Sequence, residues 1–402
     1  MNRIRRWMAL AAALLLLLPA GRGLAEVTAE QQEDQRHRVT EITWKDEQGN
    51  PAAGPEGYAT VRYEYDHNKT TEKYYDEEGF PYEMPGGYYG RAVTRDSFLR
   101  IVEYLGINGK LTQTRMGYAK TETRSFSFGP DRYVLYYGED GRLVIVPSLG
   151  YAQSETLATG KTLTGRIYKD EKGNRIDIPA GYAAMLKKMN RSKQVIRIWY
   201  EHADTTPATG PDGWSWCEIT RDGNNKGRIT AIQYFDEQGN LTDAGGFARE
   251  EYEYSKDGLV TVGRLDAQGN RIPFGGEAVK VSRKMKGDLI LEETFLNDAG
   301  ETTELPDGYA GISYTYNADG LLELTQYLDT AGAKTYCRQG YSAVRETRNV
   351  NGQLLSRCYL DASGQPVNNN ISGVSEERYE YNEDGQITVV RQYDADGAAV
   401  NQ

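Results

Sequence analysis

Apolar and aromatic residues alternate with polar residues over short stretches of this chain. In residues 59–65, Ala59, Val61, Tyr63 and Tyr65 occupy one set of alternate positions, and Arg62 and Glu64 fall between them. Residues 310–316 repeat the pattern. A period of two places the apolar set on one face of a β-strand, so the pattern predicts strands. Glycine-containing turns interrupt the chain about every 16 residues, which argues against helical repeats.

One motif recurs along the chain: an aromatic residue, any residue, aspartate, two further residues and glycine. The clear copies pair Asp46 with Gly49, Asp76 with Gly79, Asp170 with Gly173, Asp236 with Gly239, Asp329 with Gly332, and Asp361 with Gly364. Weaker copies centre on Gly106, Gly138, His202, Asp266, Asn297 and Asp394. The steps between these twelve positions are 30 to 34 residues. Such a series predicts tandem repeats, about eleven units of about 32 residues over 40–402.

Two further anchors keep the same period. The first is Pro-x-Gly-aromatic, whose aromatic residue is Tyr58, Tyr182, Trp214 or Tyr309. The second is a pair of tyrosines before a glycine turn, at Tyr252 and Tyr254, Tyr314 and Tyr316, and Tyr379 and Tyr381.

The anchors indicate tight reversals between strands. Asp or Asn followed three residues later by Gly is typical of a type I turn, in which the side-chain oxygen accepts from the backbone amide two residues on and glycine takes the positive φ. Such turns join antiparallel strands through a bulge. The sequence therefore predicts an all-β fold: an elongated array of antiparallel β-hairpin repeats in an open or gently coiled, β-solenoid-like sheet. For Met185 to Gln194 we expect a longer loop or a partial helix.

The stretch 379–397, with Tyr379, Tyr381, Asn382, Gly385 and Tyr393-Asp394, resembles the tyrosine–aspartate (YD) repeats of Rhs-type bacterial surface proteins. Residues 314–332 are similar to them as well. The resemblance implies β-hairpins that line up into long sheets at a bacterial surface, where the family forms a shell around an effector or makes surface contacts. This chain departs from the family pattern by inserting the Pro-x-Gly-aromatic segment, and it has no recognisable shell-closing core or effector.

The amino-terminal residues predict export. Arg3, Arg5 and Arg6 precede a short apolar stretch from Met8 to Ala20, and Gly23 and Ala25 suit a cleavage site. We expect a cleaved signal peptide over 1–25, a flexible lead over 26–39, and no membrane-spanning segment after cleavage. The expected location is the secreted fraction or cell envelope of a bacterium.

The charge and composition of the chain restrict the classes of partner that it can bind. The chain has 47 Lys and Arg and 58 Asp and Glu; four of the basic residues lie in the expected signal, so the mature formal charge is −15. That charge repels nucleic acid, which we exclude as a partner. Tyrosine occurs 30 times and phenylalanine 8 times. This ratio favours sheet surfaces packed with tyrosine rings whose hydroxyls remain solvated.

No catalytic set is recognisable, and we expect no enzyme and no cofactor. The Asp-x-x-Gly turns lack the full ligand set of a helix–loop–helix calcium site; weak calcium binding by the turn aspartates is left open. Three cysteines are too few for a disulfide scaffold. A pairing of Cys337 with Cys358 is left open, with Cys217 free.

Three tryptophans depart from the usual residues of the repeat. Trp214 and Trp216 lie two apart at the Gly-aromatic anchor, and Trp199 lies upstream. They are candidate ligand-binding residues that could stack on saccharide rings, although cross-strand packing on the sheet, where such residues are favoured in any case, is the first interpretation. The expected function is a secreted, non-catalytic repeat protein that binds cell-wall or surface polysaccharide through repeated weak sites. The alternative is a scaffold or adhesin that binds another envelope protein, with end-to-end self-association through its terminal strands.

Overall fold

The computed structural model describes residues 27–125, 131–160, 162–223, 227–256, 258–382 and 385–401. It divides into two compact units, whose boundary runs through one hairpin: 158–165 and the residues from 180 onward belong to the second unit. The described residues form 25 strands and no helix. The predicted all-β array of antiparallel hairpins is confirmed. The signal peptide expected over 1–25 lies outside the described residues.

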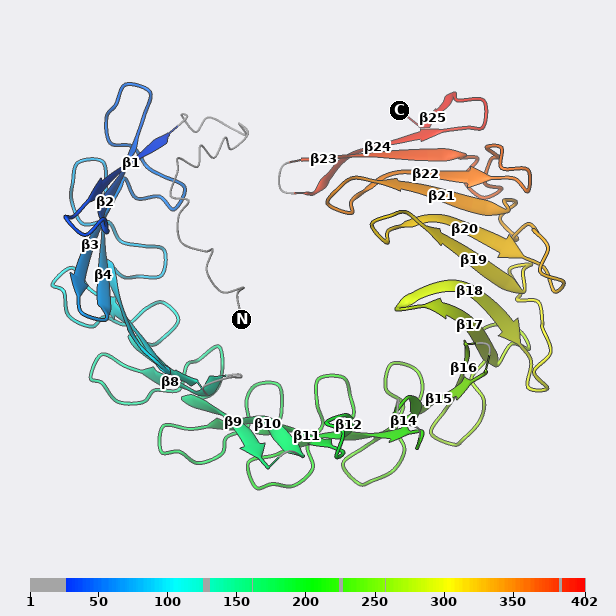
Figure 1. Ribbon diagram of the computed structural model, residues 1–402, viewed down its shortest axis with the longest axis horizontal. Helices are drawn as coiled ribbons and strands as arrows, with labels where there is room; N and C mark the ends of the chain where they lie inside the picture. The colour runs from blue at the N-terminus through cyan, green and yellow to red at the C-terminus, as the bar shows by residue number, and fades with distance from the viewer. Residues whose placement is uncertain are drawn as a thin grey trace, which may run out of the picture. The chain divides into compact units, whose positions relative to one another are not determined.

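In the first unit each strand pairs antiparallel with the next one along the chain (Figure 1). Its strands are β1 (Thr28–Glu33), β2 (Val39–Lys45), β3 (Thr60–Asp66), β4 (Lys69–Tyr75), β5 (Gly90–Asp96), β6 (Leu99–Leu105), β7 (Lys120–Ser125), β8 (Asp131–Tyr137) and β9 (Gln153–Thr159), and β10 (Leu163–Lys169) pairs with β9 at the boundary.

The second unit repeats this meander. Its strands are β11 (Ala184–Met189), β12 (Val195–Glu201), β13 (Trp216–Arg221), β14 (Ile229–Phe235), β15 (Arg249–Tyr254), β16 (Leu259–Leu265), β17 (Lys280–Lys286), β18 (Leu289–Leu296), β19 (Gly311–Tyr316), β20 (Leu322–Leu328), β21 (Ala343–Arg348), β22 (Leu354–Leu360), β23 (Glu376–Tyr381), β24 (Ile387–Tyr393) and β25 (Ala399–Asn401).

The Asp-x-x-Gly motifs form the predicted turns. Asp46 Oδ1 accepts from the backbone amides of Gln48 and Asn50 at 3.0 and 2.8 Å, and the Gly49 amide donates to the Asp46 carbonyl at 3.0 Å. Gly49 has φ of 84°, a conformation that costs glycine nothing. The same side-chain acceptance holds at the five other clear copies, Asp76, Asp170, Asp236, Asp329 and Asp361, and the paired glycines Gly79, Gly173, Gly239, Gly332 and Gly364 all have positive φ.

After each such turn the chain leaves the sheet in a short loop. The Pro-x-Gly anchor closes that loop: the Gly54 amide donates to the Tyr58 carbonyl at 2.8 Å, and the Gly57 amide donates to the Gly54 carbonyl at 2.9 Å. The loop folds over one face of the sheet, where the Trp44 ring occupies the place that a Cβ at Gly54 would take. We call this side the ladder face and the opposite side the open face.

The two anchors meet on the ladder face as a row of aromatic rings, the aromatic ladder. The first aromatic of each aromatic-x-Asp motif alternates with the aromatic of each Pro-x-Gly loop. Successive ring centroids are 4.8 to 6.2 Å apart in the first unit and 4.6 to 6.1 Å apart in the second, in tilted or edge-to-face contact. The rings are Tyr58, Tyr74, Tyr88, Tyr104, Tyr118, Tyr136, Tyr151 and Tyr168 in the first unit, and Tyr182, Tyr200, Trp214, Tyr234 and Phe247, then Phe295, Tyr309, Tyr327, Tyr341 and Tyr359, in the second.

One ladder position in the second unit holds arginine in place of a ring. The Arg264 guanidinium lies 4.7 Å from the ring centroid of Phe247 and 5.4 Å from that of Phe274. Glu250 pairs with this arginine at 3.0 Å. The cation therefore bridges two aromatic rings while a carboxylate balances its charge.

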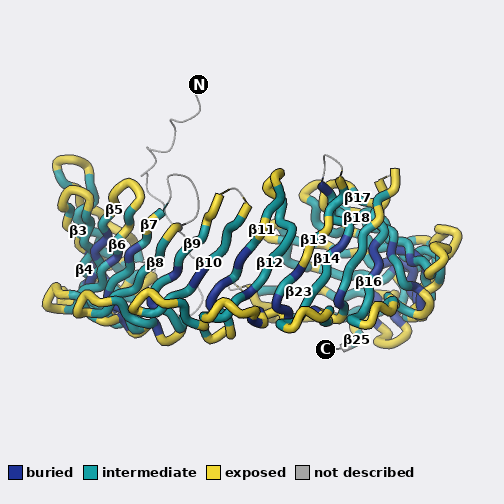
Figure 2. The backbone as a smooth tube through the Cα atoms, turned by 90° about the horizontal axis from the view of Figure 1, so that it is seen from below, coloured by how far each residue is buried: buried dark blue, intermediate teal, exposed yellow. Residues whose placement is uncertain are grey.

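The paired tyrosines join neighbouring strands. The second hydroxyl of each pair donates to a backbone carbonyl: Tyr254 to Ile229, Tyr316 to Ile290 and Tyr381 to Leu354, each at 2.8 Å. The tyrosines thereby keep a polar partner while their rings cover the sheet. Buried residues lie within the strands, and exposed residues gather at the hairpin tips and loops (Figure 2).

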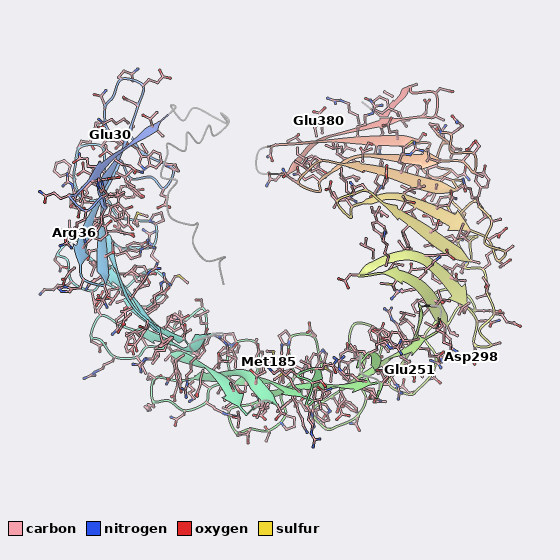
Figure 3. All side chains as sticks on the ribbon, viewed as in Figure 1. Glu30, Arg36, Met185, Glu251, Asp298 and Glu380 are labelled. Atoms are coloured by element: carbon pink, nitrogen blue, oxygen red, sulfur yellow. The ribbon has the colours of Figure 1, made fainter. Side chains whose placement is uncertain are left out.

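One local expectation was wrong. Met185 lies on β11 (Figure 3), and Asn190 to Gln194 form a turn, where we expected a loop or partial helix. Alternate residues of β11, Ala184 and Leu186, are buried, which fixes the segment in the sheet. Within the expected lead, Thr28–Glu33 form β1, whose backbone pairs with β2 although its side chains are exposed.

Two further features follow from the described residues. Cys217, Cys337 and Cys358 are all free thiols, so the pairing left open for Cys337 and Cys358 is absent. No helix able to span a membrane is found in the ranges described above.

Candidate functional site

Three aromatic side chains meet on the open face of the second unit. The register places Trp199 of β12 opposite Trp216 of β13, and Trp216 opposite Phe235 of β14. The rings of Trp216 and Phe235 stack with centroids 5.3 Å apart and an interplanar angle of 14°. Each of the three side chains is only partly buried. Together Trp199, Trp216 and Phe235 form the aromatic platform.

Charged groups border the aromatic platform. The guanidinium of Arg197 lies 5.7 Å from the Trp199 ring centroid and 5.2 Å from that of Trp216. The Trp199 indole N–H donates to Glu201 at 2.8 Å, and Glu218 lies opposite Arg197 across β12 and β13. The Arg197 Nε is buried and lacks a hydrogen-bond partner. The platform thus offers apolar ring faces beside groups that can bond hydroxyls.

Trp214 lies apart from the other two tryptophans. It belongs to the Pro-x-Gly loop, where the Gly210 amide donates to its carbonyl at 2.8 Å. Its side chain is 7% exposed and packs in the aromatic ladder between Tyr200 and Tyr234, at 5.1 and 5.7 Å. A side chain so placed cannot stack on a ligand without opening the core, so its assignment to a ligand site is not supported by this geometry.

Successive residues of β13 lie on opposite faces of the sheet. Cys217 follows Trp216 on β13 and points to the ladder face, where it packs with Tyr200 and Trp214. Burial raises the pKa of its thiol to about 11. Cys217 is therefore a buried apolar group and a poor nucleophile at neutral pH.

The other repeats serve as an internal comparison for the platform. At the positions equivalent to Trp199 and Trp216 in the strand register, none of the pairs compared from the other described strands holds two aromatic residues. The pairs are Thr43 and Thr60, Lys73 and Gly90, Glu103 and Lys120, Leu135 and Gln153, Gln233 and Arg249, Gly263 and Lys280, Thr294 and Gly311, Gln326 and Ala343, and Cys358 and Glu376. Two large aromatics are therefore not required at these positions to build the sheet.

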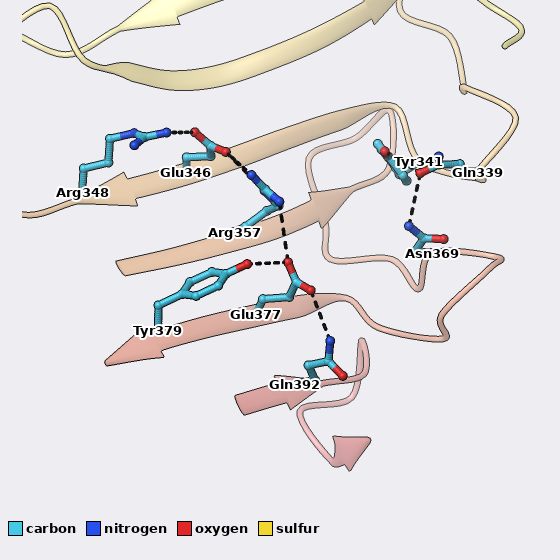
Figure 4. Close-up of polar contacts among 9 residues, drawn as sticks. All are labelled: Gln339, Tyr341, Glu346, Arg348, Arg357, Asn369, Glu377, Tyr379 and Gln392. Carbon is cyan, nitrogen blue, oxygen red and sulfur yellow. Dashed lines mark hydrogen bonds and ion pairs between the residues drawn. The ribbon is translucent and has the colours of Figure 1, made fainter. Parts of the chain in front are cut away.

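Partly buried carboxylates on the ladder face are held in ion pairs. Glu346 pairs with Arg348 at 2.6 Å and with Arg357 at 3.0 Å, and Glu377 accepts from the Tyr379 hydroxyl at 2.8 Å (Figure 4). Pairing neutralises these groups and offsets part of their desolvation. Among the residues the structure describes, no group of three or more His, Cys, Asp or Glu is arranged to hold a metal ion. The turn aspartates already use Oδ1 to accept two backbone amides, with which calcium would compete.

Sequence reasoning found the two tryptophans of the platform but missed Phe235 and Arg197. Phe235 is the middle residue of an aromatic-x-Asp motif, and that place varies between repeats. Arg197 lies two residues before Trp199, so the period of two puts it on the same face. That spacing could have identified Arg197 from the sequence. The place of Phe235 beside Trp216 depends on how the strands pair, which the sequence does not state.

The comparisons with known proteins return structures only. Neither a protein-family model nor a curated protein matches the chain. Among solved structures the chain is similar to TcdB2-TccC3 without its hypervariable C-terminal region, with a TM-score of 0.26 and 12% identity over 93% of this chain and 26% of that one. It is also similar to TcdB2-TccC3, with a TM-score of 0.21 and 11% identity over 93% of this chain and 26% of that one. A third similar structure is the Photorhabdus luminescens Tc holotoxin pore carrying a TccC3 point variant, with a TM-score of 0.21 and 11% identity over 92% of this chain and 26% of that one. The chain spans about a quarter of the length of these solved chains.

Proposed function

We propose that this chain is an exported, non-catalytic repeat scaffold of the cell envelope that binds saccharide at its open face. The observation that carries the proposal is the aromatic platform, because Trp199 and Trp216 stand side by side where the other compared repeats do not place two aromatic residues. Export rests on the signal-like residues 1–25.

The platform suits a sugar ring better than it suits a charged ligand. Indole faces offer a large apolar contact for the C–H groups of a pyranose, and the polar atoms of Glu201, Glu218 and Arg197 can bond its hydroxyls. Both signs of charge border the platform, so neutral saccharide is favoured. The ring-rich repeats do not multiply this site, since most rings pack in the aromatic ladder. Affinity has to come from one extended contact.

Retention on glycan tests the proposal. The purified chain is sedimented with insoluble peptidoglycan and applied to a panel of surface polysaccharides, with calcium and with EDTA. We expect retention that Trp216→Ala and Trp199→Ala reduce at least tenfold. The matched control is Trp214→Tyr, which gives the loop the residue of other repeats and should retain glycan normally. Equal retention by all four proteins, or none by the unaltered chain, contradicts the saccharide proposal.

A scaffold for protein contacts is the second candidate, and exposed apolar side chains favour it. Phe80, Ile107 and Ile371 are 67%, 68% and 78% exposed, and Val350 is fully exposed. These residues lie at turns, where the fold does not need them to be apolar. Exposed apolar groups are common features of protein-binding surfaces. Cross-linking to envelope proteins that polar substitutions at Phe80 and Ile107 abolish, with no glycan retention, would favour this candidate.

A further inference from the structure

A cavity of about 300 Å³ lies on the open face of the first unit, above Gly90. Lys73 and Tyr75 of β4 and Leu105 of β6 line it, together with Tyr89 and Ile107 from the adjoining loops. The turn of Gly106 to Gly109 forms one end. We call this cavity the Gly90 slot.

The strand register makes the Gly90 slot equivalent to the aromatic platform. Lys73 pairs with Gly90 and Gly90 with Leu105, as Trp199 pairs with Trp216 and Trp216 with Phe235. The turn glycines that follow correspond in the same way. Gly109 comes four residues after Leu105, and Gly239 comes four residues after Phe235. Gly90 therefore stands where the second unit has Trp216.

In the second unit the Trp216 indole fills the equivalent space. It lies nearly parallel to the Phe235 ring and reaches the following turn, since a Cβ added at Gly239 would lie 3.4 Å from its Cη2. A Cβ added at Gly109 meets no atom within 4 Å. The space that holds an indole in one unit is thus open to solvent in the other.

The backbone keeps the Gly90 slot open. A Cβ at Gly90 would come 2.8 Å from the Glu72 carbonyl oxygen, so the strands can approach this closely only with glycine. One wall is also fixed, because the Arg62 guanidinium lies 4.5 Å from the Tyr75 ring centroid. A preformed slot loses little free energy to reorganisation when a ligand enters.

We propose that the Gly90 slot binds an aromatic side chain of a partner polypeptide, with tryptophan the best fit. The ring lies over Leu105 and reaches the Gly109 turn, as Trp216 lies over Phe235 and reaches Gly239. The rim favours a polypeptide over a free small molecule, because exposed Ile107, and Phe80 beside lining residue Pro81, extend the apolar surface beyond one ring. The inference does not depend on saccharide binding, since it uses neither tryptophan of the platform as a contact.

Binding of ring probes tests the proposal. Calorimetric titration of the full chain uses N-acetyltryptophanamide, the peptide Gly-Gly-Trp-Gly-Gly, and Gly-Gly-Leu-Gly-Gly. We expect the tryptophan peptide to bind at least tenfold tighter than the leucine peptide. Leu105→Phe gives the slot the aromatic ring that Phe235 provides in the second unit. It should tighten binding of the tryptophan peptide about two- to tenfold, the range expected for a stacked aromatic pair. Ile107→Asn, at an exposed turn, should weaken binding of the tryptophan peptide more than binding of N-acetyltryptophanamide. Equal weakening of both probes would identify a small-molecule site and overturn the choice of a polypeptide.

A second variant tests the shape argument independently. Trp216→Ala opens the equivalent space in the second unit, where alanine already occurs at the matching Ala343. We expect the stoichiometry for N-acetyltryptophanamide to rise by one relative to the unaltered chain, and the amide to raise the melting temperature of this variant. Binding by Trp216→Ala at one site only, with none by the unaltered chain, overturns the proposal for the Gly90 slot. Absence of binding to both proteins overturns it as well.

Discussion

Replacement of Trp214 and of Trp216 by alanine should have opposite consequences for stability and for ligand binding. Trp214 is 7% exposed and contacts two rings of the aromatic ladder, at 5.1 and 5.7 Å. Truncation of a buried tryptophan costs about 3–5 kcal/mol, which includes the cavity left behind. Trp216 is partly buried and stacks on one ring, so its truncation should cost about 1–2 kcal/mol.

The assay must resolve local unfolding, because a repeat array is stabilised by contacts between neighbours and need not unfold in one step. Hydrogen exchange of peptides from β12 to β14, with urea unfolding followed by circular dichroism, provides this resolution. Trp214→Ala should speed hydrogen exchange in β12 to β14 more than in the other strands. Trp214→Tyr restores the residue of other repeats and should cost no more than about 1.5 kcal/mol.

Two results would contradict this assignment of Trp214 to the core: unchanged protection of β12 to β14 in Trp214→Ala, or a larger loss of stability in Trp216→Ala than in Trp214→Ala. Either result would mean that Trp214 is not part of the core. If Trp216→Ala were the more destabilising of the two, Trp214 would again be a candidate for ligand binding.

Three further predictions concern polar groups of the fold. Arg264→Met should lower the free energy of unfolding by about 1.5–3 kcal/mol, because Glu250 loses its charged partner, and Glu250→Gln in the same chain should recover part of it in urea titrations. Asp236→Ala removes the acceptor of two backbone amides and should cost about 1–2 kcal/mol by the same assay, whereas Asp236→Asn, which keeps Oδ1, should cost less. Burial raises the pKa of Tyr118 to about 12, so the folded state favours the protonated ring; its stabilisation is complete below the unfolded pKa of about 10 and is lost as pH rises towards 12. Tyr118→Phe should therefore leave unchanged the tyrosinate absorbance that the folded protein develops near pH 10, and a loss of absorbance at that pH in the variant would contradict the burial of Tyr118.

Local chemistry made the turns and the strands predictable. The hydrogen bonds of an Asp-x-x-Gly turn join atoms within four residues of each other, so the motif alone specifies the reversal. The period of two likewise states which residues of a strand share a face, as Val61 and Tyr63 do. The Met185–Gln194 segment was missed because its apolar residues, Met185, Leu186 and Met189, lack a regular alternation.

Antiparallel strands separated by glycine turns follow from the order of the amino acids, since these features depend on neighbours along the chain. The face on which each tryptophan lies depends on long-range packing: Trp214 enters the aromatic ladder, whereas Trp216 faces the other way. The period of two fails between them because Trp214 still belongs to the loop that crosses the ladder face. The register between strands likewise set Phe235 beneath Trp216 and left an open space above Gly90. Contacts across strands depend on where each loop returns to the sheet, and that is fixed by the packing of the loop against rings from neighbouring repeats.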